Sequence, residues 1–283
     1  MSAGRGTLYV VATPLGNLED LSPRAVRILG EVDLIAAEDT RRSSNLLRVH
    51  SITTPMTSFF EHNERIRGPR VLEALEEGRS VALISDAGTP GISDPGYRLV
   101  KDARDRGLTV LPVPGPSAVT TALSVCGLPT DRFLFVGFLP KKVEARRRAL
   151  QELATVSATL VVYESPIRAR ACLADMEEAW GDREVFLCRE ATKIHEEYRR
   201  STLADLRIHL AARGVLKGEL VLVVEGATPP SAATEEPLDA LYARLVAEGK
   251  TRREAVKEAA RLLGLPAREV YARVGSIRPR EGE

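Results

Sequence analysis

The fold of this chain is decided by residues 80–96, which read SVALISDAGTPGISDPG. The apolar run Val81–Ile84 predicts a strand that is buried on both faces, as in a parallel sheet covered by helices. Beyond Asp86, glycines and prolines predict a loop that a ligand can approach closely, because glycine lacks a Cβ and proline stiffens the main chain. Ligands of open α/β sheets bind at this end of a strand, so Asp86 is expected to bond a small molecule. A plain connection in which Asp94 caps the next helix stays open as the alternative.

Strands and helices alternate on either side of this segment. Ser22 and Pro23 predict the start of a helix, as its N-cap and its first residue. In the first half, the sequence predicts strands at 8–12, 34–37, 81–84 and 109–113, and helices at 23–30, 40–48, 66–77 and 95–106. This order predicts a mostly parallel sheet with helices on both faces.

Prolines and a glycine at 112–116 interrupt the alternation and indicate a domain junction. Beyond it, the sequence predicts strands at 133–138, 159–163, 185–188 and 220–224, with helices at 117–126, 143–153, 168–178 and 203–212. Residues 228–236 have the composition of a linker, and short amphipathic helices are expected at 238–248, 253–263 and 267–274. The predicted fold is therefore α/β, with an N-terminal α/β domain at 1–114, a C-terminal α/β domain at 115–230, a ligand cleft between them and a small helical extension at 235–283.

The composition is that of a soluble globular protein, with 44% hydrophobic residues, 28% charged residues and a net charge of +1. So small a net charge excludes a strong global attraction to nucleic acid, although it leaves local basic patches open. Cys126, Cys172 and Cys188 are widely spaced and predict buried thiols in a reducing compartment, with no metal site. The sequence shows neither an apolar signal peptide nor a run of membrane-spanning length, so a cytoplasmic protein is expected.

Polar and glycine-containing loops follow most of the predicted strands, at 13–18, 38–42, 85–96, 114–118, 163–166 and 224–227. Each alone could be a turn or a helix cap, but together they place polar groups around one cleft between two α/β units. The phosphate-binding motifs GxGxxG (after the first strand) and GxxxxGK[ST] are absent, which disfavours dinucleotide and P-loop sites. HExxH and GxSxG are absent as well, which disfavours zinc-protease and serine-hydrolase chemistry.

Eight short motifs occur in the order of a known family. They are PLGN at 14–17, AEDTR at 37–41, EHNE at 61–64, SDAGTP at 85–90, PGPSA at 114–118, GFLP at 137–140, YESP at 163–166 and TK at 192–193. Over residues 7–277 the chain resembles the tetrapyrrole-methylase-like family of S-adenosylmethionine-dependent enzymes, and within it the small-subunit ribosomal RNA methyltransferases. The resemblance implies two α/β domains with S-adenosylmethionine in the cleft between them and a homodimer. It also implies 2′-O-methylation of a decoding-centre cytidine in 16S rRNA, with the 30S ribosomal subunit as partner.

The resemblance further implies which residues contact S-adenosylmethionine. They are Leu15, Asp86, Ala87, Gly88, Thr89, Ile92, Ser117, Ala118, Tyr163, Gly226 and Ala227. Asp86 is accordingly expected to hold the cofactor rather than to act as a base.

A ribose hydroxyl is a poor nucleophile near pH 7, so a nearby group should orient or deprotonate it. Glu38 and Asp39 are the first candidates, because their position at the end of a strand should face the cleft beside the methyl group. Glu61 is the second candidate. The alternative for residues 61–64 is a solvated helix start with acidic residues favoured by the helix dipole.

Basic and polar side chains near the predicted cleft are candidates for RNA contacts, since arginine and lysine supply many phosphate contacts. The candidates are Arg41, Arg42, His62, Asn63, Arg65, Lys141, Lys142, Arg146, Arg147 and Lys193. Several of the basic residues between 141 and 148 are expected to share one face of a helix. The C-terminal extension, with Lys250, Arg252, Arg253 and Lys257, is expected either to dock RNA or to support a dimer.

Two other functions stay open at this point. One is a small-molecule methylase of the same fold, which would act on a tetrapyrrole or on a modified histidine. The EHNE motif and the C-terminal extension argue against it. The other is a non-catalytic ribosome-assembly factor that keeps the cofactor pocket as a structural element. Binding of S-adenosylmethionine, followed by transfer of a labelled methyl group to 30S subunits, distinguishes the three.

Overall fold

The structure is a computed structural model that describes residues 5–214, 217–228, 237–263, 265 and 267–275. The chain forms two compact units, of which the larger comprises Met1–Ala154 and Ala158–Glu225 and the smaller comprises Thr155–Ser157 and Gly226–Glu283. The predicted N-terminal domain and most of the predicted C-terminal domain fall within the larger unit, whereas residues 155–157 and 226–230 fall in the smaller one, so the boundary at residue 114 stays a prediction. Apart from its first residue, the predicted linker at 228–236 lies outside the described residues.

The first sheet of the larger unit consists of parallel strands in the order β3-β2-β4-β1-β5. The strands are β1 (Thr7–Val11), β2 (Leu34–Ala37), β3 (Met56–Ser58), β4 (Val81–Ile84) and β5 (Thr109–Val113). All four residues of β4 are buried, which confirms the strand predicted from its continuous apolar run. The sequence does not predict β3, because three half-buried residues carry too short a pattern.

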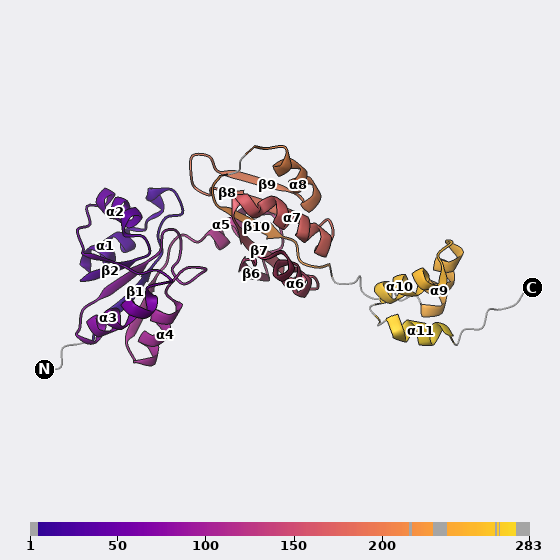
Figure 1. Ribbon diagram of the computed structural model, residues 1–283, viewed down its shortest axis with the longest axis horizontal. Coiled ribbons are helices and arrows are strands. Elements are labelled where there is room, and N and C mark those ends of the chain that lie inside the picture. Colours follow the sequence, from indigo (N-terminus) through magenta and orange to yellow (C-terminus); the bar gives the residue numbers. More distant parts are fainter. Residues whose placement is uncertain (1–4, 215–216, 229–236, 264, 266, 276–283) are drawn as a thin grey trace, which may run out of the picture. The chain divides into compact units, whose positions relative to one another are not determined.

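Helices cover both faces of this sheet (Figure 1). They are α1 (Pro23–Glu31), α2 (Thr40–Val49), α3 (Glu64–Glu76) and α4 (Tyr97–Asp105), and a short 3-10 helix, η1 (Leu18–Asp20), precedes α1. Ile35 and Ala82 pack with α1 and α2, whereas Ala36 and Leu83 pack with α3 and α4. Successive residues of β2 and β4 therefore serve opposite faces, as the pleat of a strand requires.

The second sheet has the order β6-β7-β10-β8-β9 and is mixed. Its strands are β6 (Phe133–Phe138), β7 (Thr159–Glu164), β8 (Glu184–Arg189), β9 (Glu197–Thr202) and β10 (Leu220–Val224). β6 and β7 are parallel, but β10 runs antiparallel to both of its neighbours, and β8 pairs with β9 antiparallel. The sequence does not predict β9, because this edge strand reads EYRRST and has no buried residue.

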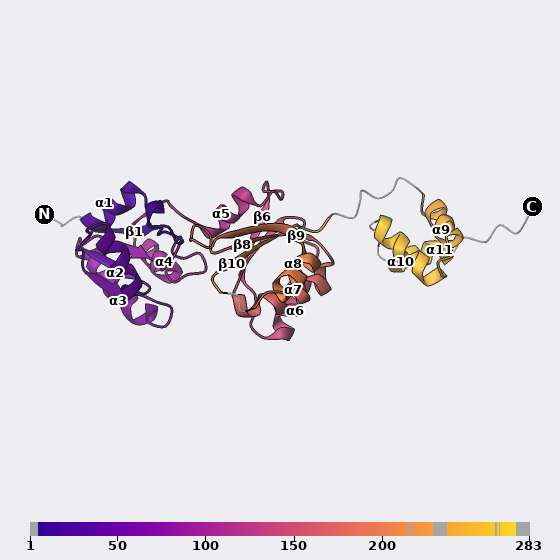
Figure 2. The same ribbon diagram turned by 90° about the horizontal axis from the view of Figure 1, so that it is seen from above.

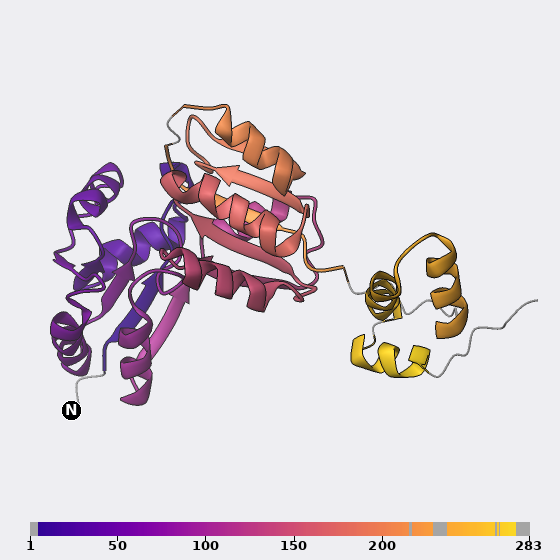
Figure 3. The same ribbon diagram turned by 45° about the vertical axis from the view of Figure 1, so that its right-hand side comes forward.

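The helices around the second sheet are α5 (Ala118–Val125), α6 (Val143–Leu153), α7 (Pro166–Trp180) and α8 (Leu203–Ala211). In the views of Figures 2 and 3, α5 lies on one side of the sheet and α6, α7 and α8 lie on the other. Val119 and Leu123 of α5 pack against Val161 and Val221 of the sheet. This packing places the start of α5 at the edge of the sheet where β7 ends.

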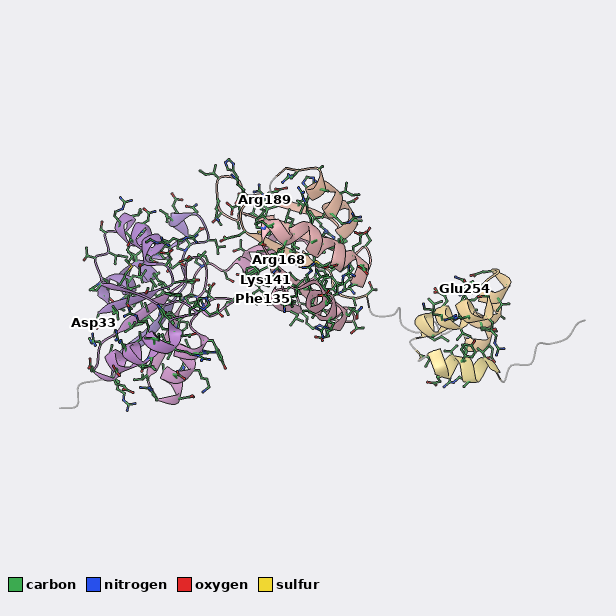
Figure 4. The ribbon with its side chains drawn as sticks, in the orientation of Figure 1. Asp33, Phe135, Lys141, Arg168, Arg189 and Glu254 are labelled. Carbon is green, nitrogen blue, oxygen red and sulfur yellow. The ribbon has the colours of Figure 1, made fainter. Side chains whose placement is uncertain are left out.

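The smaller unit consists of α9 (Leu238–Ala247), α10 (Arg252–Leu263) and α11 (Ala267–Gly275), which pack around a core that includes Leu241, Val256 and Val270. Its three helices confirm the predicted helical extension. The main-chain N–H of Thr251 donates to Oε2 of Glu254 at 2.9 Å, which forms half of a capping box at the start of α10 (Glu254 is labelled in Figure 4). Within the described ranges, no helix combines the length and apolar character needed to cross a membrane.

Gly96, which precedes α4, occupies a backbone conformation that other residues rarely adopt. Its φ is +127°, and a Cβ at this position would lie 2.6 Å from Cδ2 of Leu83. We expect Gly96→Ala to lower the free energy of unfolding by ~1–3 kcal/mol, because an L-residue is strained at this φ. Gly30→Ala is the matched control, since nothing lies within 4 Å of its Cβ position in α1 and alanine favours helices, so stability should be unchanged or higher. Urea unfolding measures both, and wild-type stability of Gly96→Ala contradicts the expected strain.

Candidate methyl-donor site

A cavity of about 350 Å³ lies within the larger unit, at the carboxyl ends of β1, β2 and β4. Its volume is in the range of small-ligand sites. Its lining residues are Leu15, Glu38, Arg42, Asp86, Ala87, Gly88, Thr89, Ile92, Ser93, Asp94, Ser117, Ala118, Phe138, Tyr163, Glu164, Ser165, Pro166, Gly218, Glu219, Leu220 and Val221. The structure thus brings together nine of the eleven residues that the family resemblance implies for the cofactor.

The loop after β4 is held against the loop after β1 by the main chain. Thr13 and Gly88 exchange two N–H···O bonds of 2.8 and 2.9 Å. Gly88 has φ +83°, and its Cβ position would lie 3.4 Å from Cδ2 of Leu15. A side chain at Gly88 would therefore be strained by its positive φ, so glycine lets the two loops form one wall of the cavity.

Asp86 organises the neighbouring loop after β2. Its Oδ1 accepts a hydrogen bond from the N–H of Asp39 at 3.1 Å, and its Oδ2 accepts one from Nη1 of Arg42 at 3.0 Å. The N–H of Asp86 in turn donates to Oε2 of Glu38 at 3.1 Å. Each carboxylate oxygen keeps lone pairs for a ligand, so Asp86 can position the loops and still contact a bound molecule.

The two adjacent acids Glu38 and Asp39 differ sharply in their surroundings. Glu38 lines the cavity, and burial raises the pKa of its carboxyl group. Asp39 does not line the cavity but caps α2, and it accepts hydrogen bonds from the main chain and the side chain of Arg41. Those bonds lower the pKa of Asp39 to about 2. Glu38 therefore fits a role at the acceptor, whereas the carboxylate of Asp39 is already committed to the helix start.

Asp94 lies in the cavity rather than at a helix start. The residue before α4 is Gly96, and α4 has no side-chain cap, so the alternative of an Asp94 cap is not what the structure shows. Burial chiefly raises the pKa of Asp94 to about 7, the nearby charge of Glu38 raises it further, and a hydrogen bond with Ser85 acts in the opposite direction. Asp94 therefore changes its charge near neutral pH.

Aromatic rings form the opposite wall of the cavity. The Tyr163 ring meets Phe135 and Phe138 edge to face, with centroid distances of 4.9 and 5.6 Å (Phe135 is labelled in Figure 4). Burial raises the pKa of the Tyr163 hydroxyl to about 12, so this hydroxyl is neutral at physiological pH. Ser117, at the start of α5, makes no side-chain capping bond, which leaves its hydroxyl available to a ligand.

The EHNE motif lies outside the cavity lining. Glu61 and His62 are exposed, and the structure does not bring either to the cavity. Asn63 instead holds the turn before α3, since its Oδ1 accepts the N–H of Phe60 at 2.8 Å and its Nδ2 donates to the carbonyl of Ser58 at 3.1 Å. This geometry favours the alternative of a helix start for residues 61–64.

The cations predicted to contact RNA differ in their exposure and in their ion pairs. Arg42 lines the cavity, whereas Arg41, exposed over 90% of its side chain, pairs with Asp39 at 2.8 Å. Lys141 is exposed just before α6 (Figure 4). Lys193 pairs with Glu190 and with the cavity residue Glu219 at 2.8 and 3.3 Å.

The expectation of a shared basic face on α6 is wrong for Arg146. Its side chain is buried and pairs with Asp175 of α7, and Arg147 pairs with the same carboxylate at 2.9 Å. Arg147 also pairs with Glu178 at 3.0 Å. These arginines therefore join α6 to α7, and Lys141, Lys142 and Arg148 are the exposed basic groups of this segment for which the described residues show no ion pair.

Gly226 and Ala227 do not line the cavity, in contrast to what the resemblance implies. They follow Val224, which pairs with Leu160 at the start of β7, whereas Leu220 pairs with Glu164 at the end of β7. Because β10 is antiparallel, its first residues reach the cavity and its last residues lie at the other edge of the sheet. Gly218, Glu219, Leu220 and Val221 occupy the cavity edge instead.

Comparison with known proteins agrees with this architecture. Residues 7–207 match the family model described as Tetrapyrrole (Corrin/Porphyrin) Methylases. The chain belongs to this family. It is 46% identical to "Ribosomal RNA small subunit methyltransferase I" of Halalkalibacterium halodurans, over 94% of each chain. A protein of the same name from Pseudomonas aeruginosa is 50% identical over 81% of this chain and 82% of that one, and the Bacillus subtilis protein is 42% identical over 94% and 93%.

Solved structures of tetrapyrrole methylases show the same fold. Uroporphyrin-III-C-methyltransferase from Thermus thermophilus superposes with a TM-score of 0.56 at 21% identity, covering 77% of this chain and 94% of that chain. The methyltransferase CobJ gives a TM-score of 0.59 at 19% identity, over 78% and 95%. These likenesses confirm the predicted α/β fold of the tetrapyrrole methylase family.

Sequence reasoning misses several lining residues of this tetrapyrrole methylase cavity. Asp94 and Ser93 belong to the very loop that the sequence singles out, but a helix cap is an equally good explanation of an acid before a helix. Glu164, Ser165 and Pro166 stand in the YESP motif, so the polar loop after β7 is the signal that points to them. Residues 218–221 have no such signal, because the direction of β10 is not visible in its apolar run.

Proposed function

We propose that this methylase transfers the methyl group of S-adenosylmethionine to the ribose 2′-oxygen of a decoding-centre cytidine in 16S rRNA. The observation that carries the proposal is the cavity, in which carboxylates, hydroxyls and aromatic rings from both sheets face one space of ligand size. Relatives that match over 94% of the chain are named as methyltransferases of small-subunit ribosomal RNA, which supports this acceptor.

The cavity residues fit S-adenosylmethionine in charge and shape. Carboxyl groups of Glu38 and Asp86 suit a ligand that carries a sulfonium and an ammonium. Leu15 and Ile92, together with Tyr163, offer apolar and aromatic surface for an adenosine. The free hydroxyl of Ser117 and the main chain around Ala118 add polar contacts. When bound, the cofactor supplies an activated methyl group.

The residues of the chain contribute position and charge to the transfer. Holding the ribose hydroxyl in line with the methyl group replaces a bimolecular encounter by an oriented one, which lowers the barrier. Glu38 lies where the loops after β2 and β4 meet, and its carboxylate orients the hydroxyl. Arg42 pairs with Asp86 and fixes the acid beside Glu38. Asp39 and Glu61 have no part in this mechanism, because neither lines the cavity.

RNA reaches the cavity past exposed cations on the loops around it. Arg41 and Lys141 contact phosphates in this proposal, and Lys193 lies next to the cavity residue Glu219. The partner is the 30S subunit in the cytoplasm, and the enzyme acts as a homodimer. The helical extension carries cations at Lys250, Arg252, Arg253 and Lys257 that would add further phosphate contacts.

Label transfer tests the proposal. The chain is incubated with methyl-labelled S-adenosylmethionine and with unmodified 30S subunits, naked 16S rRNA or no RNA, and RNA-bound label is counted. We expect label in RNA only in the presence of enzyme. Cofactor binding in calorimetry without label in either RNA would point to a small-molecule acceptor, and absence of binding would favour the assembly-factor alternative.

A further inference from the structure

Asp94 is a carboxyl group of the cavity to which the proposed function gives no specific task. It is half-buried, it lines the cavity, and the buried hydroxyl of Ser85, which donates to the carbonyl of Gly88 at 3.4 Å, lies close enough to lower its pKa. It lies in the loop after β4, in a segment where the preceding Ser93 has φ +61°. A non-glycine residue with such a φ is uncommon and is found at sites where the surrounding structure fixes the backbone.

Asp94 shares with Glu38 the lack of an ion pair among the described residues, whereas the other three acids of the cavity lining each have a cationic partner. Asp86 pairs with Arg42, and Glu219 pairs with Lys193. Glu164, whose side chain is fully buried, pairs with Arg168 at 2.8 Å (Arg168 is labelled in Figure 4). These three carboxylates are therefore already engaged by a neighbouring cation.

Glu38 is the other cavity acid without an ion pair, and it differs from Asp94 in its hydrogen bond. The N–H of Asp86 donates to Oε2 of Glu38, a bond that favours the ionised carboxylate. Two nearby carboxyl groups in different surroundings commonly divide into one that stays ionised and one that exchanges a proton. Burial nevertheless raises the pKa of Glu38 overall, so the two acids differ in their partners: the main chain of Asp86 already occupies Glu38, whereas Asp94 has no main-chain hydrogen bond and no ion pair among the described residues.

We propose that Asp94 is the catalytic base, whose carboxylate accepts the proton of the acceptor hydroxyl during methyl transfer. This inference rests on the proposed function. The new bond joins the hydroxyl oxygen to the methyl carbon, and the electron pair of the broken carbon–sulfur bond stays on sulfur, which loses its positive charge. The proton moves from the hydroxyl to Asp94, which later releases it to solvent. Atoms and charge balance without any further reactant.

The electrostatic surroundings of Asp94 suit this task. Its pKa of about 7 lies near the working pH, where a general base is most effective. The charged and titratable groups that face it or share the cavity are Glu38, Arg42, Asp86, Tyr163, Glu164 and Glu219. A cationic ligand in the cavity would favour the ionised form of Asp94 and so lower its pKa. The rate of methyl transfer should therefore rise with pH up to about 7 or somewhat below, and then level off.

The test measures the single-turnover rate of methyl transfer to unmodified 30S subunits at saturating S-adenosylmethionine. The rate is measured from about pH 5.5 to about pH 9, because a general base with a pKa near neutrality titrates within this range. We expect Asp94→Asn to reduce the rate about 10²–10⁴-fold and to remove its rise with pH. Binding of S-adenosylmethionine to this variant, measured by calorimetry, should stay close to that of the wild type. Asp102→Asn is the matched control, because Asp102 is exposed on α4 and lies outside the cavity lining.

Ser85→Ala provides a second measurement, the pH dependence of the transfer rate, which would not change if Asp94 had only a structural role. Loss of the Ser85 hydroxyl removes an interaction that lowers the pKa of Asp94, so the rise of rate with pH should move to higher pH. A wild-type rate for Asp94→Asn overturns the proposal, and so does a loss of rate explained entirely by weaker cofactor binding. Failure of the wild-type protein to label 30S subunits would instead remove the proposed function, which keeps the two failures distinguishable.

Discussion

Asp175→Ala is expected to lower the free energy of unfolding by ~3–5 kcal/mol, because it leaves a buried arginine without its counter-charge. The side chains of Arg146 and Asp175 are exposed over only 5% and 6% of their surface. Nε of Arg146 donates to Oδ2 of Asp175 at 2.7 Å, while Nε of Arg147 donates to Oδ1 at 2.9 Å. One carboxylate thus neutralises two guanidinium groups at the contact of α6 with α7. Urea unfolding of the full chain measures the effect.

Glu178→Ala is the matched control on the same helix. Glu178 pairs with Arg147 at 3.0 Å but is exposed over 64% of its side chain, so its loss should cost no more than ~1 kcal/mol. The double variant Arg146→Met/Asp175→Leu removes both buried charges and should recover most of the lost stability, since apolar residues of similar size often replace a buried ion pair without cost. Equal stability of Asp175→Ala and Glu178→Ala would contradict the burial of the pair.

Ala118→Trp is expected to abolish binding of S-adenosylmethionine while the protein stays folded. Ala118 is the first residue of α5 and lines the cavity of about 350 Å³, so an indole there takes space that a ligand needs. Ser124→Trp, on the exposed part of the same helix, is the control and should bind as the wild type does. Calorimetric titration with S-adenosylmethionine measures both. Unchanged affinity of Ala118→Trp would place the cofactor elsewhere in the molecule.

Local sequence patterns predict the first sheet well, because buried parallel strands carry a strong signal. The runs Leu34–Ala37 and Val81–Ile84 have the predicted bounds, and Oγ of Ser22 caps α1 by accepting the N–H of Ala25 at 3.1 Å. The polar edge strand Glu197–Thr202 carries no apolar pattern. Its stability comes from pairing with β8, which depends on residues far away in the chain.

The candidate site shows the same limit of local patterns. The cavity residues after β1, β2 and β4 are predictable, since parallel strands must end at one edge. The direction of β10 is not predictable from its apolar residues, and so Gly218 rather than Gly226 reaches the cavity. The burial of Arg146 is likewise not predictable from local sequence, because it depends on Asp175, which lies 29 residues away along the chain.

Nucleoside analysis of the labelled RNA tests the central claim most directly. Unmodified 30S subunits are incubated with the wild-type chain and methyl-labelled S-adenosylmethionine, and the 16S rRNA is then digested to nucleosides and separated. The proposed mechanism predicts that the label is found in 2′-O-methylcytidine and that it disappears with Ala118→Trp, which fills the cavity. Label on a base atom, or no label in RNA despite cofactor binding, would contradict a 2′-oxygen acceptor at this cavity.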